Sequence, residues 1–205
     1  MTFDLTPEQQ VLIATANTLD SLPAKALDAV LVIEERASHD PASAARFGFE
    51  GIGGRSNVTA TALLPGLEGS EAALSSIPDD QRLRARLLAA AVALGVGKAA
   101  VLHAIASMKR RDVKPGPDAT APHWTFADGA TDVAAARLLT YNAAQMLDRN
   151  EPAAPAIERA HVFAADAAQR AVDAAIKVEG VSGYTKGGLL ERLSRDARTL
   201  QVILR

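Results

Sequence analysis

The side chains of this chain that could do chemistry are scattered along it. Among the four histidines, no two lie four residues apart, the spacing of a helical metal site; they are His39, His103, His123 and His161. The chain has no cysteine, so it offers no disulfide and no thiolate ligand. The "GIGG" cluster at 51–54 lacks the preceding strand and following lysine of a phosphate-binding loop. These patterns predict no metal site, no nucleotide loop and no serine triad.

Composition favours closely packed helices. Apolar residues make up 48% of the chain, many of them alanine, and aromatics only 4%. The net charge of −2 gives no electrostatic reason to expect binding to nucleic acid or to an anionic membrane. The first ten residues lack the basic and apolar regions of a signal peptide, and Lys98 interrupts the longest apolar run. We expect a cytoplasmic protein without a membrane span.

The first part of the chain predicts two helices followed by a linker. Thr6 and Gln9 fit a capping box with Pro7 at the first helical position, and this helix is expected to run to about Asp20. A second helix is predicted over 24–39, because Asp40-Pro41 stops it. Residues 50–80 are rich in glycine and proline, and contain the only strand candidate, "NVTATALL".

The second part predicts long helices with short connections. From Arg82 on, apolar residues recur three or four apart: Leu83, Leu87, Ala90, Leu94, Gly97, Val101, Ile105 and Met108. A helix over about 123–150 is expected to turn five side chains inward: Phe126, Ala130, Val133, Leu138 and Tyr141. Further helices are predicted from Pro152 to about Glu179 and over 188–203. Four long helices with short connections predict an antiparallel four-helix bundle.

Five segments resemble, in order, the acyl-CoA dehydrogenase family. They are "FDLTPEQQVLIATANTL", "LDAVLVIEERASHDPASAA", "RLLAAAVALGVGKAAVLHAI", "FADGATDVAAARLLTYNAAQMLD" and "GYTKGGLLERLSRDAR", and they cover roughly two thirds of the chain. The last two are specific. The resemblance implies an all-α fold, in which the family's C-terminal antiparallel four-helix bundle (81–205) joins a small N-terminal helical segment (1–49). The linker 50–80 stands where the family has its β-barrel domain, so no β-barrel domain is expected.

The resemblance also implies that the catalytic base is missing. Family members take the α proton of an acyl-CoA with a carboxylate while the flavin accepts the β hydride. The two positions where members carry this carboxylate fall on Leu204 and Ala85, and neither can accept a proton. Glu71, Asp79 and Asp80 could be proposed as substitutes, but a solvated linker or a helix start explains them better. No catalytic residue is predicted.

The implied flavin contacts are fewer than in the family. Arg111 matches an arginine that meets the cofactor's pyrophosphate across the dimer interface, a role that suits the planar fork of a guanidinium. Alternatively, Arg111 is an ordinary surface arginine in a basic cluster with Lys109 and Arg110, and the sequence does not favour either interpretation. Gly180 and Val181 stand where the family has two glycines near the adenosine, and a helix C-cap is the preferred interpretation of Gly180.

Arg86 matches an arginine near the substrate site of related enzymes. A structural ion pair with Asp196 or Glu191 is the commoner role for such a residue. Arg192, Arg195 and Asp196 resemble the family's ion-pair cluster in the last helix and are interpreted as structural.

Together these features predict an auxiliary partner subunit. It would join a full-length acyl-CoA dehydrogenase through its bundle, as a homo- or hetero-oligomer, with FAD either shared with the partner or absent. Bulky acyl-CoA esters such as steroid side chains are the suggested substrates. Two alternatives stay open: a non-redox scaffold or dimerisation module, and a repurposed non-redox enzyme on the same bundle.

Overall fold

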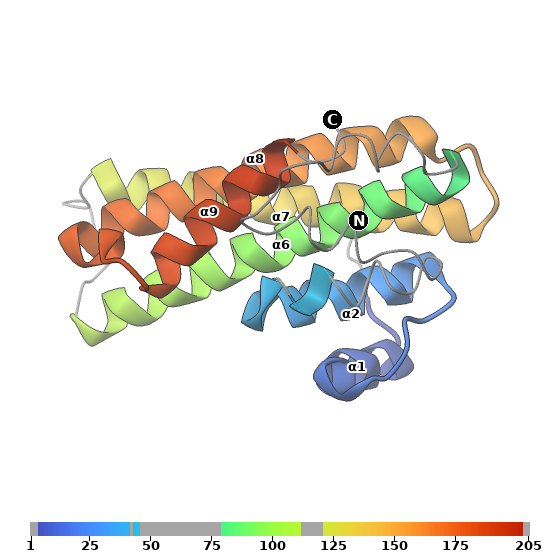
Figure 1. Cartoon of the computed structure of the whole chain (residues 1–205), viewed down its shortest axis with the longest axis horizontal. Coiled ribbons are helices and arrows are strands. Elements are labelled where there is room, and N and C mark those ends of the chain that lie inside the picture. Colours follow the sequence, from blue (N-terminus) through green and yellow to red (C-terminus); the bar gives the residue numbers. More distant parts are fainter. Residues whose placement is uncertain (1–3, 42, 46–78, 112–120, 203–205) are drawn as a thin grey trace.

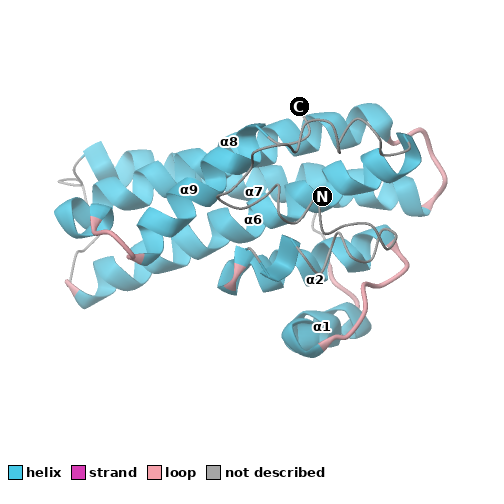
Figure 2. Ribbon diagram, viewed as in Figure 1, coloured by secondary structure: helices cyan, strands magenta, loops and turns pink. Residues whose placement is uncertain are grey.

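A computed structural model describes residues 4–41, 43–45, 79–111 and 121–202, and all regular elements in these ranges are helical (Figures 1 and 2). The α-helices are α1 (Pro7–Thr15), α2 (Ala26–His39), α6 (Asp79–Arg110), α7 (Ala121–Asp148), α8 (Ala154–Glu179) and α9 (Leu189–Val202). Helices α6, α7 and α8 lie side by side and alternate in direction, α9 packs on α8 and α6, and α2 covers another side of α6 and α7. The predicted all-α bundle is confirmed.

Alanine forms the contact surfaces of the bundle. In α8 the buried face includes Ala164, Ala168, Ala171 and Ala175, each no more than a few per cent exposed. Such small side chains let helix axes approach closely, which maximises dispersion contacts between backbones. At Gly129 on α7 an added Cβ would lie 3.2 Å from the Cα of Ala171, so the α7–α8 contact is close to backbone on backbone.

Helix α2 crosses α6 at a glycine. A Cβ added to Gly95 would lie 2.4 Å from the Cβ of Ala37 and 2.6 Å from the carbonyl oxygen of Glu34. No side chain fits in that space, so Gly95 is required by the close approach of the two helices.

The start of α2 is capped from another helix. Asp148, the last residue of α7, accepts hydrogen bonds from the amides of Ala26 (2.6 Å) and Leu27 (3.0 Å). The N-cap residue Lys25 makes no side-chain cap hydrogen bond, so this carboxylate satisfies amides that α2 cannot satisfy itself.

A buried ionic network fastens the middle of α2 to α7. Glu34, 4% exposed, accepts hydrogen bonds from Arg137 Nε (2.8 Å) and the Tyr141 hydroxyl (2.7 Å). Burial opposes the charge of Arg137, but the neighbouring Glu34 carboxylate outweighs this and raises the pKa of Arg137. Burial first, and then the charge of Glu34, raise the pKa of Tyr141, which keeps its hydroxyl a donor.

The predicted helix bounds agree with the structure to within about three residues, except at the end of α1. The capping box of Thr6 and Gln9 is present, with Pro7 at the first turn. Helix α1 ends at Thr15 and continues as a short 3-10 turn, Ala16–Thr18, instead of running to Asp20. The inward placement of Leu138 is wrong, because this side chain is 45% exposed on the outer face of α7.

The predicted linker 50–80, with its strand candidate, lies outside the described residues except for its last two positions, where α6 begins. By length and composition, the segment Arg82–Arg110 of α6 could cross a membrane. However, 72% of its apolar window is buried inside the bundle, as expected for the core helix of a packed fold.

Candidate functional site

Three of the predicted site residues meet at one end of the bundle. Since α6 and α8 run in the same direction, their C-terminal ends lie together, at the left of Figure 1. Arg111, just past the end of α6, donates from Nη2 to the carbonyl oxygen of Val178 on α8 (2.8 Å). Gly180 and Val181 follow two and three residues later. The structure thus brings Arg111 beside the turn that carries Gly180 and Val181.

The turn after α8 presents open backbone. Gly180 caps α8 with φ of +78° and leads into a short 3-10 helix, Gly180–Tyr184. A Cβ there would meet nothing within 4 Å, so the left-handed backbone explains this glycine and close packing does not. Val181 is 91% exposed, and Tyr184 is also exposed. This surface is open to a ligand or a partner chain.

Glu179 adds a negative charge to this end, and the sequence analysis missed its role. Its Oε2 atom is buried, and His103 Nε2 lies 3.9 Å away. Hydrogen bonding by the buried Ser107 hydroxyl lowers the pKa of Glu179, and the charges of His103, Arg111 and Arg110 lower it further against the opposing effect of burial. Glu179 is therefore ionised at neutral pH, close to the predicted phosphate-binding arginine.

Arg86 lies far from this end. It is on the first half of α6, 25 residues before Arg111, which corresponds to about 37 Å at 1.5 Å per residue. Its Nη1 donates to Glu158 Oε1 of α8 at 3.0 Å, a partner that the sequence did not suggest. Glu191, one of the predicted partners, pairs with Arg195 on its own helix at 2.9 Å. The substrate and cofactor candidates therefore do not form one compact site in this chain.

The position predicted for a base in α6 is part of the core. Ala85 is 2% exposed and belongs to the main apolar cluster. Leu204 lies outside the described residues. Asp79 and Asp80 are the first two residues of α6, while Glu71 lies outside the described residues.

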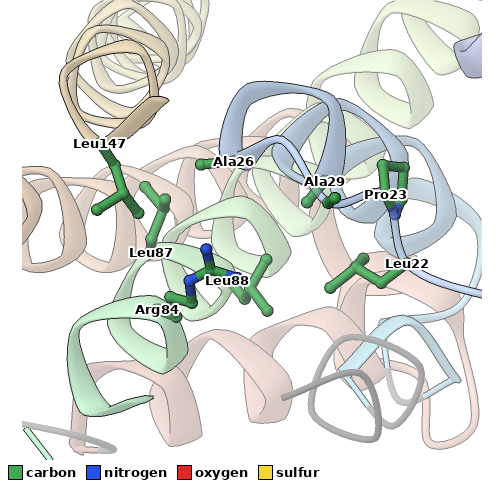
Figure 3. Close-up of a pocket in the computed structure, with 9 residues that line it drawn as sticks. Leu22, Pro23, Ala26, Ala29, Arg84, Leu87, Leu88 and Leu147 are labelled. Atoms are coloured by element: carbon green, nitrogen blue, oxygen red, sulfur yellow. The ribbon is translucent and has the colours of Figure 1, made fainter. Parts of the chain in front are cut away.

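An apolar pocket of about 110 Å³ lies near the start of α6 (Figure 3). Leu87 and Leu88 of α6, Leu147 of α7 and the Leu22–Pro23 segment before α2 contribute to its lining. Arg84 is the one charged side chain among the residues that the structure assigns to the lining. With no carboxylate, hydroxyl or imidazole among them, the pocket offers no proton acceptor for α-proton removal.

The described residues contain no group of three His, Asp or Glu side chains placed to hold a metal ion. His39 lies 3.5 Å from Glu35, one helical turn earlier. Glu35 also forms an ion pair with Lys98. His39 thus serves an ion-pair contact on its own helix.

Comparison with known proteins agrees with the arrangement of helices. Residues 81–203 match the family model "Acyl-CoA dehydrogenase, C-terminal domain". A 3-(aryl)acrylate reductase of Clostridium sporogenes is 38% identical over 119 residues, which are 57% of this chain and 32% of that protein. A caffeyl-CoA reductase-Etf complex subunit, CarC, of Acetobacterium woodii is 33% identical over 119 residues, which are 57% of this chain and 31% of that protein.

A solved structure shows the same fold. Butyryl-CoA dehydrogenase from Megasphaera elsdenii superposes with a TM-score of 0.72 at 15% identity, over 100% of this chain and 96% of that chain. In the sequence comparisons, by contrast, the matched segment spans about a third of the length of the curated relatives. Because the family model covers more than half of the sequence, this chain belongs to the acyl-CoA dehydrogenase family through its C-terminal helical domain.

Proposed function

We propose that this chain is an auxiliary, non-catalytic subunit that joins a full-length FAD-dependent acyl-CoA dehydrogenase. One observation carries the proposal: the bundle of the family is intact, while the position of the base in α6 is a buried alanine, Ala85, sealed in the core at 2% exposure. The other base position, the one that most members use, is Leu204, which has no ionisable group either. A scaffold kept without its proton acceptor suits a subunit that supplies shape and contacts to a catalytic partner.

The residues at the shared end of α6 and α8 fit part of a flavin site. Arg111 provides a guanidinium beside the open backbone of Gly180 and Val181, which suits the pyrophosphate and adenosine end of FAD. Bound there, FAD would supply the acceptor for the β hydride of the substrate, and the rest of its contacts would come from the partner subunit. The role of this chain is to bind and orient the phosphates.

The outer face of the bundle offers a surface for that partner. Trp124, Leu138 and Leu139 are exposed apolar side chains on α7. On a helix face that stays in contact with water, polar side chains would be expected. A bundle-to-bundle contact with a full-length dehydrogenase would cover them. Bulky acyl-CoA substrates, such as those with steroid side chains, extend the proposal on the resemblance alone. A cytoplasmic location is part of the same proposal.

The test is to purify the chain alone and after co-expression with any full-length acyl-CoA dehydrogenase encoded beside it. We expect the two chains to elute together, with a flavin absorption band in the complex and none in the single chain. A panel of acyl-CoA esters then compares the turnover of the complex with that of the dehydrogenase alone. Separate elution, with unchanged turnover by the dehydrogenase, would refute the partner role and favour a non-redox scaffold.

A further inference from the structure

Glu179 is an acid at the same end of the bundle as Arg111, the arginine proposed to bind a flavin phosphate. It is the last residue of α8 and directly precedes Gly180. Arg111 reaches the same segment through its hydrogen bond to Val178, the residue before Glu179. Arg111 therefore binds the backbone carbonyl of the residue that directly precedes the one carrying the carboxylate.

The carboxylate is held in place from several sides. Ser182 Oγ, in the turn, donates to Glu179 Oε1 at 3.4 Å, and His103 of α6 lies 3.9 Å from Oε2. Only 17% of the Glu179 side chain is exposed, so it cannot swing freely into solvent when an anion arrives. The Oε2 atom is buried, so the negative charge of Glu179 stays at this end of the bundle, near the charges of His103, Arg110 and Arg111.

The electrostatic interaction between Glu179 and Arg111 is reciprocal. If the cations of Arg110 and Arg111 favour the ionised form of Glu179, the ionised carboxylate lowers the attraction of the same cations for any other anion. A pyrophosphate that approached Arg111 would meet both charges.

We infer that Glu179 acts as an internal competitor for Arg111, so that this chain binds flavin phosphates weakly unless a partner subunit contributes further cations. This inference rests on the proposed function, since it assigns the same end of the bundle to FAD. It identifies Glu179 as the residue that sets the affinity of the isolated chain for the cofactor. It also gives a physical reason for sharing FAD between two subunits. This chain supplies part of the site, and its own carboxylate weakens FAD binding when the partner is absent.

The experiment titrates FAD into the isolated full chain and follows binding by calorimetry and by quenching of flavin fluorescence. In Glu179→Gln, which keeps the shape and removes the charge, we expect FAD to bind about tenfold more tightly than in the wild type. The double variant Glu179→Gln with Arg111→Gln should lose this gain. Glu151→Gln, at the opposite end of the bundle in the loop between α7 and α8, is the matched control and should bind as the wild type does.

Thermal melts of each variant, followed by far-UV circular dichroism, check that a loss of FAD binding is not caused by a loss of fold. Equal FAD binding by the wild type and Glu179→Gln, including no binding by either, would overturn the inference. So would a gain that survives the removal of Arg111. Because the measurement uses the chain alone, it can succeed even if co-expression reveals no dehydrogenase partner, and it can fail while the complex forms.

Discussion

The buried network around Glu34 should contribute more to stability than any other ionic contact of α2. Glu34 is 4% exposed and accepts hydrogen bonds from both Arg137 and Tyr141 of α7. Changing Glu34→Gln removes the charge while nearly keeping the volume. It leaves Arg137 without its counter-charge and exchanges a charge-assisted bond to the Tyr141 hydroxyl for a neutral one.

The magnitude follows from burial. Breaking a fully buried ion pair costs about 3–5 kcal/mol. Since the side chain of Arg137 is 33% exposed, water can partly solvate it after the change, so we expect a cost below that range, about 2–3 kcal/mol. For a chain of this length, that corresponds to a fall in Tm of about 4–12 °C.

The adjacent residue provides the control. Glu35 bonds Lys98 of α6 at 2.5 Å, but the two side chains are 21% and 28% exposed. Glu35→Gln should therefore cost about 1 kcal/mol or less. Urea unfolding followed by far-UV circular dichroism measures both variants. If Glu34→Gln costs no more than Glu35→Gln, the network does not fasten α2 to α7 and the reasoning fails.

Three further predictions concern stability. Replacing Asp148 by Ala removes the cap of α2 and should lower the free energy of unfolding by about 1 kcal/mol in urea titrations. Changing Gly95→Ala places a Cβ 2.4 Å from that of Ala37 and should lower the free energy of unfolding by about 2–3 kcal/mol in the same assay. Gly187 has a φ of +80° but open space around it, so Gly187→Ala should cost only about 1 kcal/mol. Burial, with the charge of a nearby aspartate, raises the pKa of Asp196 above its ordinary 3.8 despite the opposing arginines. The folded state then binds its proton more tightly than the unfolded state, so stability is lost as the pH rises through this range, and Asp196→Asn should raise Tm at pH 7 but not at pH 3.

Each of these predictions has a result that contradicts it. An unchanged unfolding midpoint for Asp148→Ala would mean that water replaces the carboxylate at the first turn of α2. Equal costs for the two glycine variants would show that α2 shifts away from α6 at little expense. A Tm gain for Asp196→Asn that is the same at both pH values would point to packing as its cause and exclude ionisation.

Much of the fold could be predicted because it depends on local patterns. The spacing of Leu87, Leu94 and other apolar residues identifies the inner face of α6, and Thr6 with Gln9 marks the start of α1. Leu138 was misplaced because a regular apolar period does not distinguish the core face from an exposed face of a bundle helix. Only the tertiary arrangement decides that difference.

The candidate site was predictable in its residue types and not in its geometry. The resemblance identified Arg111 and Gly180, and the structure places them at one end of the bundle. Arg86 pairs with Glu158, and Glu179 is near Arg111. Both glutamates belong to α8, far along the chain from the two arginines. Such contacts depend on the rotation of α8 against α6, for which the sequence carries no direct signal.

The cap that Asp148 places on α2 joins residues more than a hundred positions apart, and this has a consequence for the order of folding. A helix of 14 residues without a cap of its own is marginal in water, so α2 should gain full helicity only after the end of α7 has reached its first turn. That contact closes a long loop and is expected late, after α6, α7 and α8 have paired locally. In native-state hydrogen exchange, the first amides of α2 should therefore open before those of α6.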